Sequence, residues 1–86
     1  MIKVLFFARL REQLGFSEQH VNWQDGEHDA ATVQTLLNTL VDNGGAKWQV
    51  LLADEIVAAK NQQAVSRDTL LADGDEVAFF PPVTGG

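Results

Sequence analysis

The segment that most restricts the fold is a single amphipathic helix, predicted to begin after Thr32. The Thr32 hydroxyl is a candidate N-cap, because it can accept a hydrogen bond from a free backbone N–H of the first turn. Apolar residues then recur at the spacing of one helix face: Val33, Leu36, Leu37, Leu40 and Val41. Gly44 and Gly45 are expected to end the helix in a left-handed cap. One such helix among strand-like segments can cover only one face of one sheet.

Two strands are predicted before this helix. Residues 2–10 alternate in character, and the face expected to enter the core carries Ile2, Val4, Phe6 and Ala8. Residues 11–14 indicate one helical turn, which Gly15 closes. Residues 17–23 indicate a second strand. Its aligned face carries Gln19, Val21 and Trp23, and Asp25-Gly26 supplies the turn after it.

Three further strands are predicted after the helix. Residues 46–52 indicate a short helical or irregular cover over the core. Residues 56–60 and 64–66 form two strands around a turn at Asn61-Gln62. Residues 76–80 form the last strand, after a reversal at Asp73-Gly74-Asp75. In this strand Val77 and Phe79 alternate with Ala78 and Phe80.

The order of these elements predicts an α+β roll with a mixed sheet covered by one main helix. The economical arrangement places the first and last strands side by side and parallel at the sheet centre, which is the β-grasp topology. The domain is expected to span residues 1–82, and residues 83–86 are expected to form a flexible tail. Pro81 and Pro82 cannot donate to a strand ladder, so pairing ends there.

Composition excludes several classes of function. The net charge of −6 would repel phosphate backbones, so no nucleic acid is expected and basic partner surfaces are favoured. The absence of cysteine excludes disulfides, thiolate zinc sites and a thiol nucleophile within this sequence. The apolar run at residues 4–8 is too short for a signal peptide or a membrane span, so a cytoplasmic protein is expected.

The sequence ends on Gly85-Gly86, which follow an apolar strand, two prolines and Val83-Thr84. Glycine has no Cβ, so such a tail can thread a tunnel too narrow for other residues. The reactive atom would then be the terminal carbonyl carbon of Gly86. The alternative is a frayed terminus without chemistry, which is the common fate of chain ends.

The sequence resembles the MoaD family, the ubiquitin-like small subunits of molybdopterin synthase. The resemblance covers the full length, and its most specific part is residues 73–86 with their Pro-Pro-Val-Thr-Gly-Gly ending. Shorter matches are the Val4 to Ala8 strand, Arg11-Glu12 with Gly15, the Thr32-Val33 helix start with Leu36 and Leu40, and Asn61. Lys60 departs from the family pattern, in which an aliphatic residue commonly precedes this asparagine.

The resemblance implies a sulfur carrier. A partner adenylating enzyme would use ATP to activate the Gly86 carboxylate, and a sulfur donor would convert the adenylate into a thiocarboxylate. The tail, with Val83, Thr84 and Gly85 as its threading residues, would enter the large subunit of a heteromer, expected to be a heterotetramer. Sulfur would then pass to cyclic pyranopterin monophosphate. This chain would bind no cofactor and supply no catalytic side chain.

Phe7 and Phe80 are the candidate partner-binding residues, together with Pro81 and Pro82. By alternation both phenylalanines lie on the sheet face opposite Phe6 and the core, and their strands should be neighbours. Two exposed aromatic rings side by side favour a docking patch. The alternative is that neighbouring side chains cover each ring.

Other candidate sites are weak. His20 and His28 lack a clear third ligand for a metal, so no metal site is expected. Asp73, Asp75 and Glu76 lack the spacing of a calcium loop and indicate a plain turn. Ser17 and Ser66 lie in no nucleophile motif, and Trp23 and Trp48 are typical of core residues.

Three classes of function stay open at this point. The first is a sulfur carrier for molybdopterin synthase. The second is a related carrier or protein modifier, serving thiamin or thiolated-RNA synthesis or forming isopeptide bonds to lysine. The third is a β-grasp binding module whose tail has no chemistry.

Overall fold

The structure is a computed structural model, which describes residues 1–22, 31–53 and 55–81. In chain order the elements are β1 (Ile2–Phe6), α1 (Arg9–Leu14), β2 (Glu18–Val21), α2 (Val33–Gly44), the 3₁₀ helix η1 (Ala46–Leu52), β3 (Val57–Lys60), β4 (Gln63–Val65) and β5 (Glu76–Phe80). None of the helices in this part of the chain has the length and apolar character needed to cross a bilayer.

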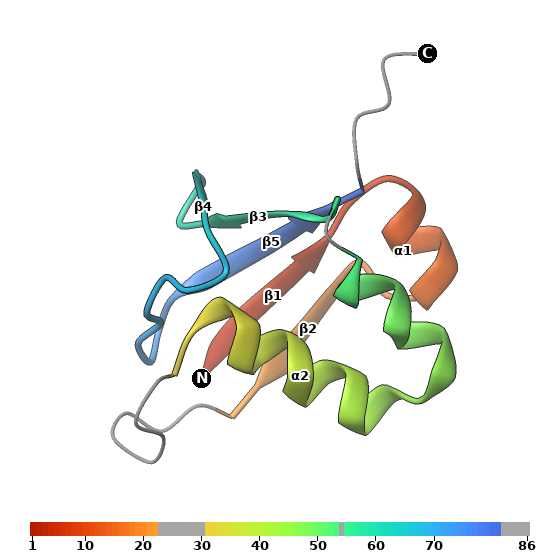
Figure 1. Cartoon of the computed structure of the whole chain (residues 1–86), viewed down its shortest axis with the longest axis horizontal. Helices are drawn as coiled ribbons and strands as arrows, with labels where there is room; N and C mark the ends of the chain where they lie inside the picture. Colours follow the sequence, from red (N-terminus) through yellow and green to blue (C-terminus); the bar gives the residue numbers. More distant parts are fainter. Residues whose placement is uncertain (23–30, 54, 82–86) are drawn as a thin grey trace.

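The five strands form one mixed sheet in the order β2-β1-β5-β3-β4. The first and last strands, β1 and β5, pair in parallel at its centre, and all other pairs are antiparallel. Helix α2 crosses one face of this sheet (Figure 1). The predicted α+β roll with β-grasp topology is therefore confirmed.

Helix α2 begins where the sequence predicts. The Thr32 Oγ1 atom accepts a hydrogen bond from the Thr35 backbone N–H at 3.3 Å, and Thr35 Oγ1 accepts one from the Thr32 N–H at the same distance. This reciprocal pair satisfies two free donors of the first turn. The predicted apolar face packs on the core, with Val33, Leu36, Leu37 and Leu40 buried and Val41 partly buried.

The end of α2 differs from the prediction. Gly44 is the last helical residue, and Gly45 caps the helix with φ 94° and ψ −167°, which is not the left-handed helical conformation. A Cβ at Gly44 would overlap the indole of Trp48, a buried residue of η1. Glycine is therefore required at position 44 for the close approach of the indole rather than for a left-handed turn.

We expect Gly44→Ala to lower the free energy of unfolding by about 2 kcal/mol, because the new methyl group displaces Trp48 from the core. Alanine has the higher helix propensity, by about 1 kcal/mol, but the cost of displacing Trp48 is larger than this gain, so the net effect is a loss of stability. Asn43→Ala is the matched control, since Asn43 is exposed on the same turn and should change stability by less than about 0.5 kcal/mol. Equal stabilities of the two variants in urea denaturation would contradict this role of Gly44.

The first strand is shorter than predicted, and Ala8 is not a core residue. The ladder between β1 and β5 closes where the Phe7 N–H donates to the Phe79 carbonyl at 3.2 Å. Ala8 then adopts φ 54° and is exposed, because the chain turns there into α1. Leu10 enters the core from this helix. Gly15 closes α1, as predicted, and adopts the left-handed conformation, but the helix begins at Arg9, two residues before the predicted turn.

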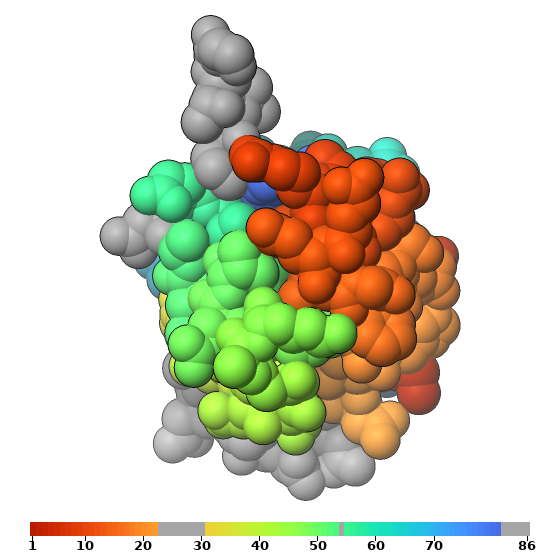
Figure 2. Space-filling model, turned by 90° about the vertical axis from the view of Figure 1, so that its right-hand side faces the viewer, coloured from red at the N-terminus to blue at the C-terminus, as the bar shows by residue number. Residues whose placement is uncertain are grey.

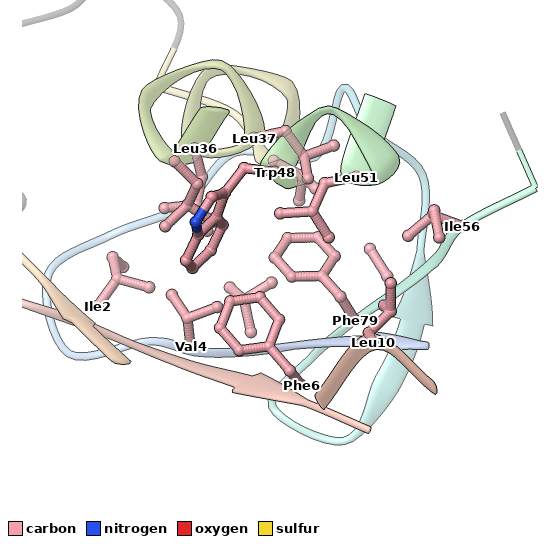
Figure 3. Packing of buried hydrophobic residues seen from close by; sticks show 14 of the residues in the cluster. Ile2, Val4, Phe6, Leu10, Leu36, Leu37, Trp48, Leu51, Ile56 and Phe79 are labelled. Atoms are coloured by element: carbon pink, nitrogen blue, oxygen red, sulfur yellow. The ribbon is translucent and has the colours of Figure 1, made fainter. Parts of the chain in front are cut away.

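The core lies between the sheet and the helices (Figure 3). Phe6 of β1 contacts Trp48 of η1 edge to face, with ring centroids 5.5 Å apart. The ring of Phe6 also stacks on that of Phe79 of β5, with ring centroids 6.3 Å apart. Trp48 is thus a core residue, as expected. Because β1 and β5 bury alternate side chains on this face, their remaining side chains point to the opposite face.

The predicted turns after α2 are confirmed. Asn61 and Gln62 form the turn between β3 and β4, with φ values of 50° and 74°. The Asn61 side chain accepts a hydrogen bond from the Glu76 N–H at 3.0 Å and donates to Asp75 at 3.2 Å. These bonds fix the β3–β4 turn to the start of β5. The predictions for Trp23, Asp25-Gly26 and His28 lie outside the described residues.

Candidate functional site

The sheet face opposite α2 carries an apolar patch, which we term the outer face. The strand register places Val57 beside Phe80, Ala59 beside Ala78, and Leu5 beside Ala78. A shallow concavity of about 330 Å³ lies on this face, between Phe7, Phe80 and the turn residue Gln62. No helix of the described residues is packed against it (Figure 1).

Phe7 and Phe80 form the aromatic centre of the outer face. Their rings stack with centroids 4.7 Å apart and planes at 8° to each other. Phe7 is 39% exposed and Phe80 is half-buried, so each ring covers part of the other. The prediction that the two rings are neighbours on the face away from the core is confirmed. Their role in binding a partner stays a prediction.

A charged cluster borders the outer face on the β2 side. The Lys3 Nζ atom lies 3.8 Å from Oε1 of Glu18 and 4.0 Å from Oε2 of Glu76. His20 Nε2 lies 2.7 Å from Glu18 Oε2. This hydrogen bond lowers the pKa of Glu18, and the Lys3 ammonium acts in the same direction. The outer face thus has an apolar centre and a polar border, the usual anatomy of a protein interface.

Pro81 directly follows β5 and is half-buried beside a second hollow of about 190 Å³. This hollow lies on the helix side of the sheet, between α1 and the segment that joins η1 to β3. In Figure 2 the blue end of β5 shows between the red start of α1 and the green segment after η1. The remaining predicted site residues, Pro82, Val83, Thr84, Gly85 and Gly86, lie outside the described residues.

The weaker candidate sites behave as structural groups. Asp75 accepts a hydrogen bond from the Ala72 N–H at 2.8 Å, so the 73–75 segment is a turn, as predicted. His20 bonds Glu18 on the exposed face of β2, and Ser66 Oγ bonds the carboxylate of Asp68. Within residues 1–22, 31–53 and 55–81, no group of three His, Asp or Glu side chains could hold a metal ion.

Sequence reasoning missed the roles of two cationic side chains. Lys60, the departure from the family pattern, donates from Nζ to the Leu70 carbonyl at 3.1 Å and lies 3.9 Å from Asp75 Oδ2. Arg67 donates to the backbone carbonyls of Leu52 and Ile56 at 3.4 Å and also to that of Ala53. Both side chains join segments distant in sequence, so no local pattern could have identified them.

Comparison with known proteins identifies the family. The family model described as the ThiS family matches residues 4–86. The chain belongs to the ThiS family. The resemblance to the small subunits of molybdopterin synthase is also confirmed. This ThiS-family chain is 47% identical to the molybdopterin synthase sulfur carrier subunit of Escherichia coli K12 and 38% identical to that of Haemophilus influenzae, in each case covering 100% of both chains.

Solved structures support the same fold for this ThiS-family chain. Small archaeal modifier protein 1 from Methanosarcina acetivorans superposes with a TM-score of 0.76 at 29% identity, covering 99% of this chain and 95% of that one. The complex of subunits 1 and 2 of the molybdopterin-converting factor from Helicobacter pylori contains a chain with a TM-score of 0.63 at 21% identity. That match covers 99% of this chain and 97% of the other, and shows the fold alone.

Proposed function

We propose that the chain is the sulfur carrier subunit of molybdopterin synthase. The observation that carries the proposal is the 47% identity, over the whole of both chains, to a protein of that name. The Gly85-Gly86 ending and the aromatic pair at the end of the last strand fit the same function. We also propose a cytoplasmic location, where ATP is available for activation of the tail.

The proposed chemistry uses the terminal carbonyl of Gly86. A carboxylate is a poor acceptor for nucleophiles, so an adenylating enzyme joins it to the α-phosphate of ATP and releases pyrophosphate. A sulfur donor then attacks the carbonyl carbon, and AMP leaves. The resulting thiocarboxylate is a soft nucleophile, and its sulfur forms a bond to carbon of cyclic pyranopterin monophosphate. Water then cleaves the bond between this sulfur and the Gly86 carbonyl carbon, which leaves the sulfur on the product and restores the Gly86 carboxylate. Two such deliveries supply both sulfurs of a dithiolene.

The folded body has the task of aiming the tail. The parallel pairing of β1 and β5 brings the ring of Phe7 against the ring of Phe80. Phe80 is the residue directly before Pro81. A partner that holds this pair therefore fixes the point from which residues 82–86 depart. Holding a reacting group in a defined position removes much of the entropic cost of a reaction between two molecules. In the proposed function, the large subunit supplies the acid, base and substrate-binding groups. The two kinds of subunit form a heterotetramer. ATP is used by the separate adenylating enzyme.

The proposed function is tested by reconstitution. The chain is first treated with an adenylating enzyme, ATP and a sulfur donor, and is then mixed with a large subunit and cyclic pyranopterin monophosphate. We expect molybdopterin to form only when the treated chain and the large subunit are both present. Product formation at the same rate with untreated chain would contradict the proposal.

A second candidate function is protein modification, since two structural relatives at 29% identity are named SAMP1, one of them in full as small archaeal modifier protein 1. A modifier stays joined through Gly86 to a lysine side chain, whereas a carrier is released after each transfer. With a tagged chain in cell extracts, we expect the tag mainly at monomer mass and in a complex that denaturant dissolves. A ladder of denaturant-resistant species, lost on Gly86 deletion, would instead support modification.

A further inference from the structure

The sheet ends at β2, whose outer edge is paired with no strand of the described residues. A hollow of about 300 Å³ lies between residues 19–22 and the second half of α2, which Figure 2 shows beside each other. Consecutive strand residues point to alternate faces, so a hollow lined by all four must run along the backbone edge of β2. We term this hollow the edge groove. Its other wall consists of Thr39, Leu40, Asn43, Gly44 and Trp48.

The register of β2 shows which of its backbone groups face the edge groove. The Phe6 N–H donates to the carbonyl of Ser17, which lies opposite it, at 3.0 Å. In an antiparallel pair, hydrogen-bonded positions alternate with positions whose backbone groups point away from the partner strand. Gln19 and Val21 therefore direct their backbone groups towards β1. The N–H and carbonyl of His20 point to the free edge, where an added strand can bond them.

Gln19 supplies a buried polar atom without a partner. Its side chain lies on the helix side of the sheet, since Gln19 is opposite the buried Val4 of β1, and it lines the edge groove. The Gln19 Oε1 atom is buried and accepts no hydrogen bond from any described residue. Such atoms are rare in folded proteins, because they lose their bonds to water without gaining others. A ligand that donates an N–H or O–H to Oε1 removes this cost.

The charges of the edge groove select an uncharged ligand. Its lining contains no Asp, Glu, Lys or Arg, and its polar side chains include the amides of Asn22 and Asn43 and the hydroxyl of Thr39. An ammonium or a carboxylate group would lose hydration there without gaining an ion-pair partner. A second copy of this chain is disfavoured, because each copy carries a net charge of −6.

We infer that the edge groove binds an extended segment of a partner protein, which adds to the sheet as a strand beside β2. The backbone of this segment bonds the N–H and carbonyl of His20. An adjacent residue of the segment points to the helix side, and its uncharged amide or hydroxyl side chain donates to Gln19 Oε1. This site includes neither Phe7 and Phe80 nor the tail, so the inference goes beyond the proposed function and does not depend on it.

The test uses short blocked peptides, acetyl-Val-Thr-Xaa-Thr-Val-amide, in which Xaa is Gln, Leu or Glu and the flanking residues favour an extended backbone. Each peptide is titrated into the isotope-labelled full chain, and the backbone amide resonances are followed by NMR. His20→Pro removes the N–H at the free edge without removing a bond to β1. His20→Ala is the matched control, because it keeps that N–H. Gln19→Leu removes the buried acceptor, and thermal unfolding checks that each variant is folded.

We expect the Gln peptide to shift the resonances of residues 18–22 and to bind about tenfold more tightly than the Leu and Glu peptides. His20→Pro should weaken binding of the Gln peptide about tenfold, whereas His20→Ala should change it less than about twofold. Gln19→Leu should remove the preference for the Gln peptide over the Leu peptide, because the acceptor that selects a donor is gone.

Three results would overturn the inference. The first is the absence of shifts in residues 18–22 with the Gln peptide at millimolar concentration. The second is equal affinity of folded His20→Pro and His20→Ala variants, or, if the proline variant does not fold, an unchanged preference for the Gln peptide in Gln19→Leu. The third is a change in these resonances with the concentration of the chain alone, which would show that a second copy occupies the edge groove.

Discussion

Deleting Gly86 is expected to abolish sulfur transfer while leaving the domain folded. Under the proposed function the terminal carbonyl is the electrophile that is activated, and the deletion moves it back by one residue. The thiocarboxylate would then stop about 3.5 Å short of its position in the large subunit, and a misplacement of about 1 Å can already cost about 100-fold in rate. Molybdopterin formation in the reconstituted assay measures the effect.

The controls separate tail chemistry from folding and docking. The deletion variant should keep the melting temperature of the wild type, since the described fold ends its last strand at Phe80. It should also bind the large subunit through the outer face. Gly85→Ala should reduce transfer strongly, because a Cβ is added to the threading segment. A Gly86 deletion that retains full molybdopterin synthesis would refute the proposed chemistry.

The second large effect is expected at Phe80. Phe80→Ala should weaken binding to the large subunit and to the adenylating enzyme by about 2 kcal/mol, which is about 30-fold in Kd. The physical reason is the loss of the ring that stacks on Phe7 at 4.7 Å in the centre of the outer face. Titration calorimetry with each partner measures the change.

Phe79→Ala is the matched control, because Phe79 is the preceding residue of β5 and points to the opposite face. Phe79 is fully buried, so its truncation should lower the free energy of unfolding by about 3–5 kcal/mol. Phe80→Ala should change stability much less, since its ring is half-exposed. A sharp fall in melting temperature for Phe80→Ala with unchanged affinity would show that Phe80 serves the core.

Much of the fold was predictable because its signals are local. The period of the apolar residues identified α2, and the Thr32 cap marked its start. Alternation in β1 and β5 identified both faces, and hence the pairing of Phe7 with Phe80 once the two strands were placed side by side. The aromatic centre of the candidate site therefore follows from strand alternation together with topology.

The errors arose where a local pattern continues past a change in backbone conformation. Ala8 and Leu10 extend the alternation of β1, but Ala8 turns the chain at φ 54° and Leu10 packs from α1. Gly44 resembles a helix stop signal, yet it is required for contact with Trp48. The roles of Lys60 and Arg67 escaped prediction because each side chain bonds to a segment that is distant in sequence.

The most direct test of the account is the intact mass of the chain after incubation with an adenylating enzyme, ATP and a sulfur donor. We predict a mass increase equal to the exchange of one oxygen for one sulfur, located by fragmentation at Gly86 and lost again when the charged chain reacts with the large subunit and cyclic pyranopterin monophosphate. An unchanged mass with a fully active adenylating enzyme, or sulfur found on any residue other than Gly86, would contradict the proposal that this chain carries sulfur on its last residue.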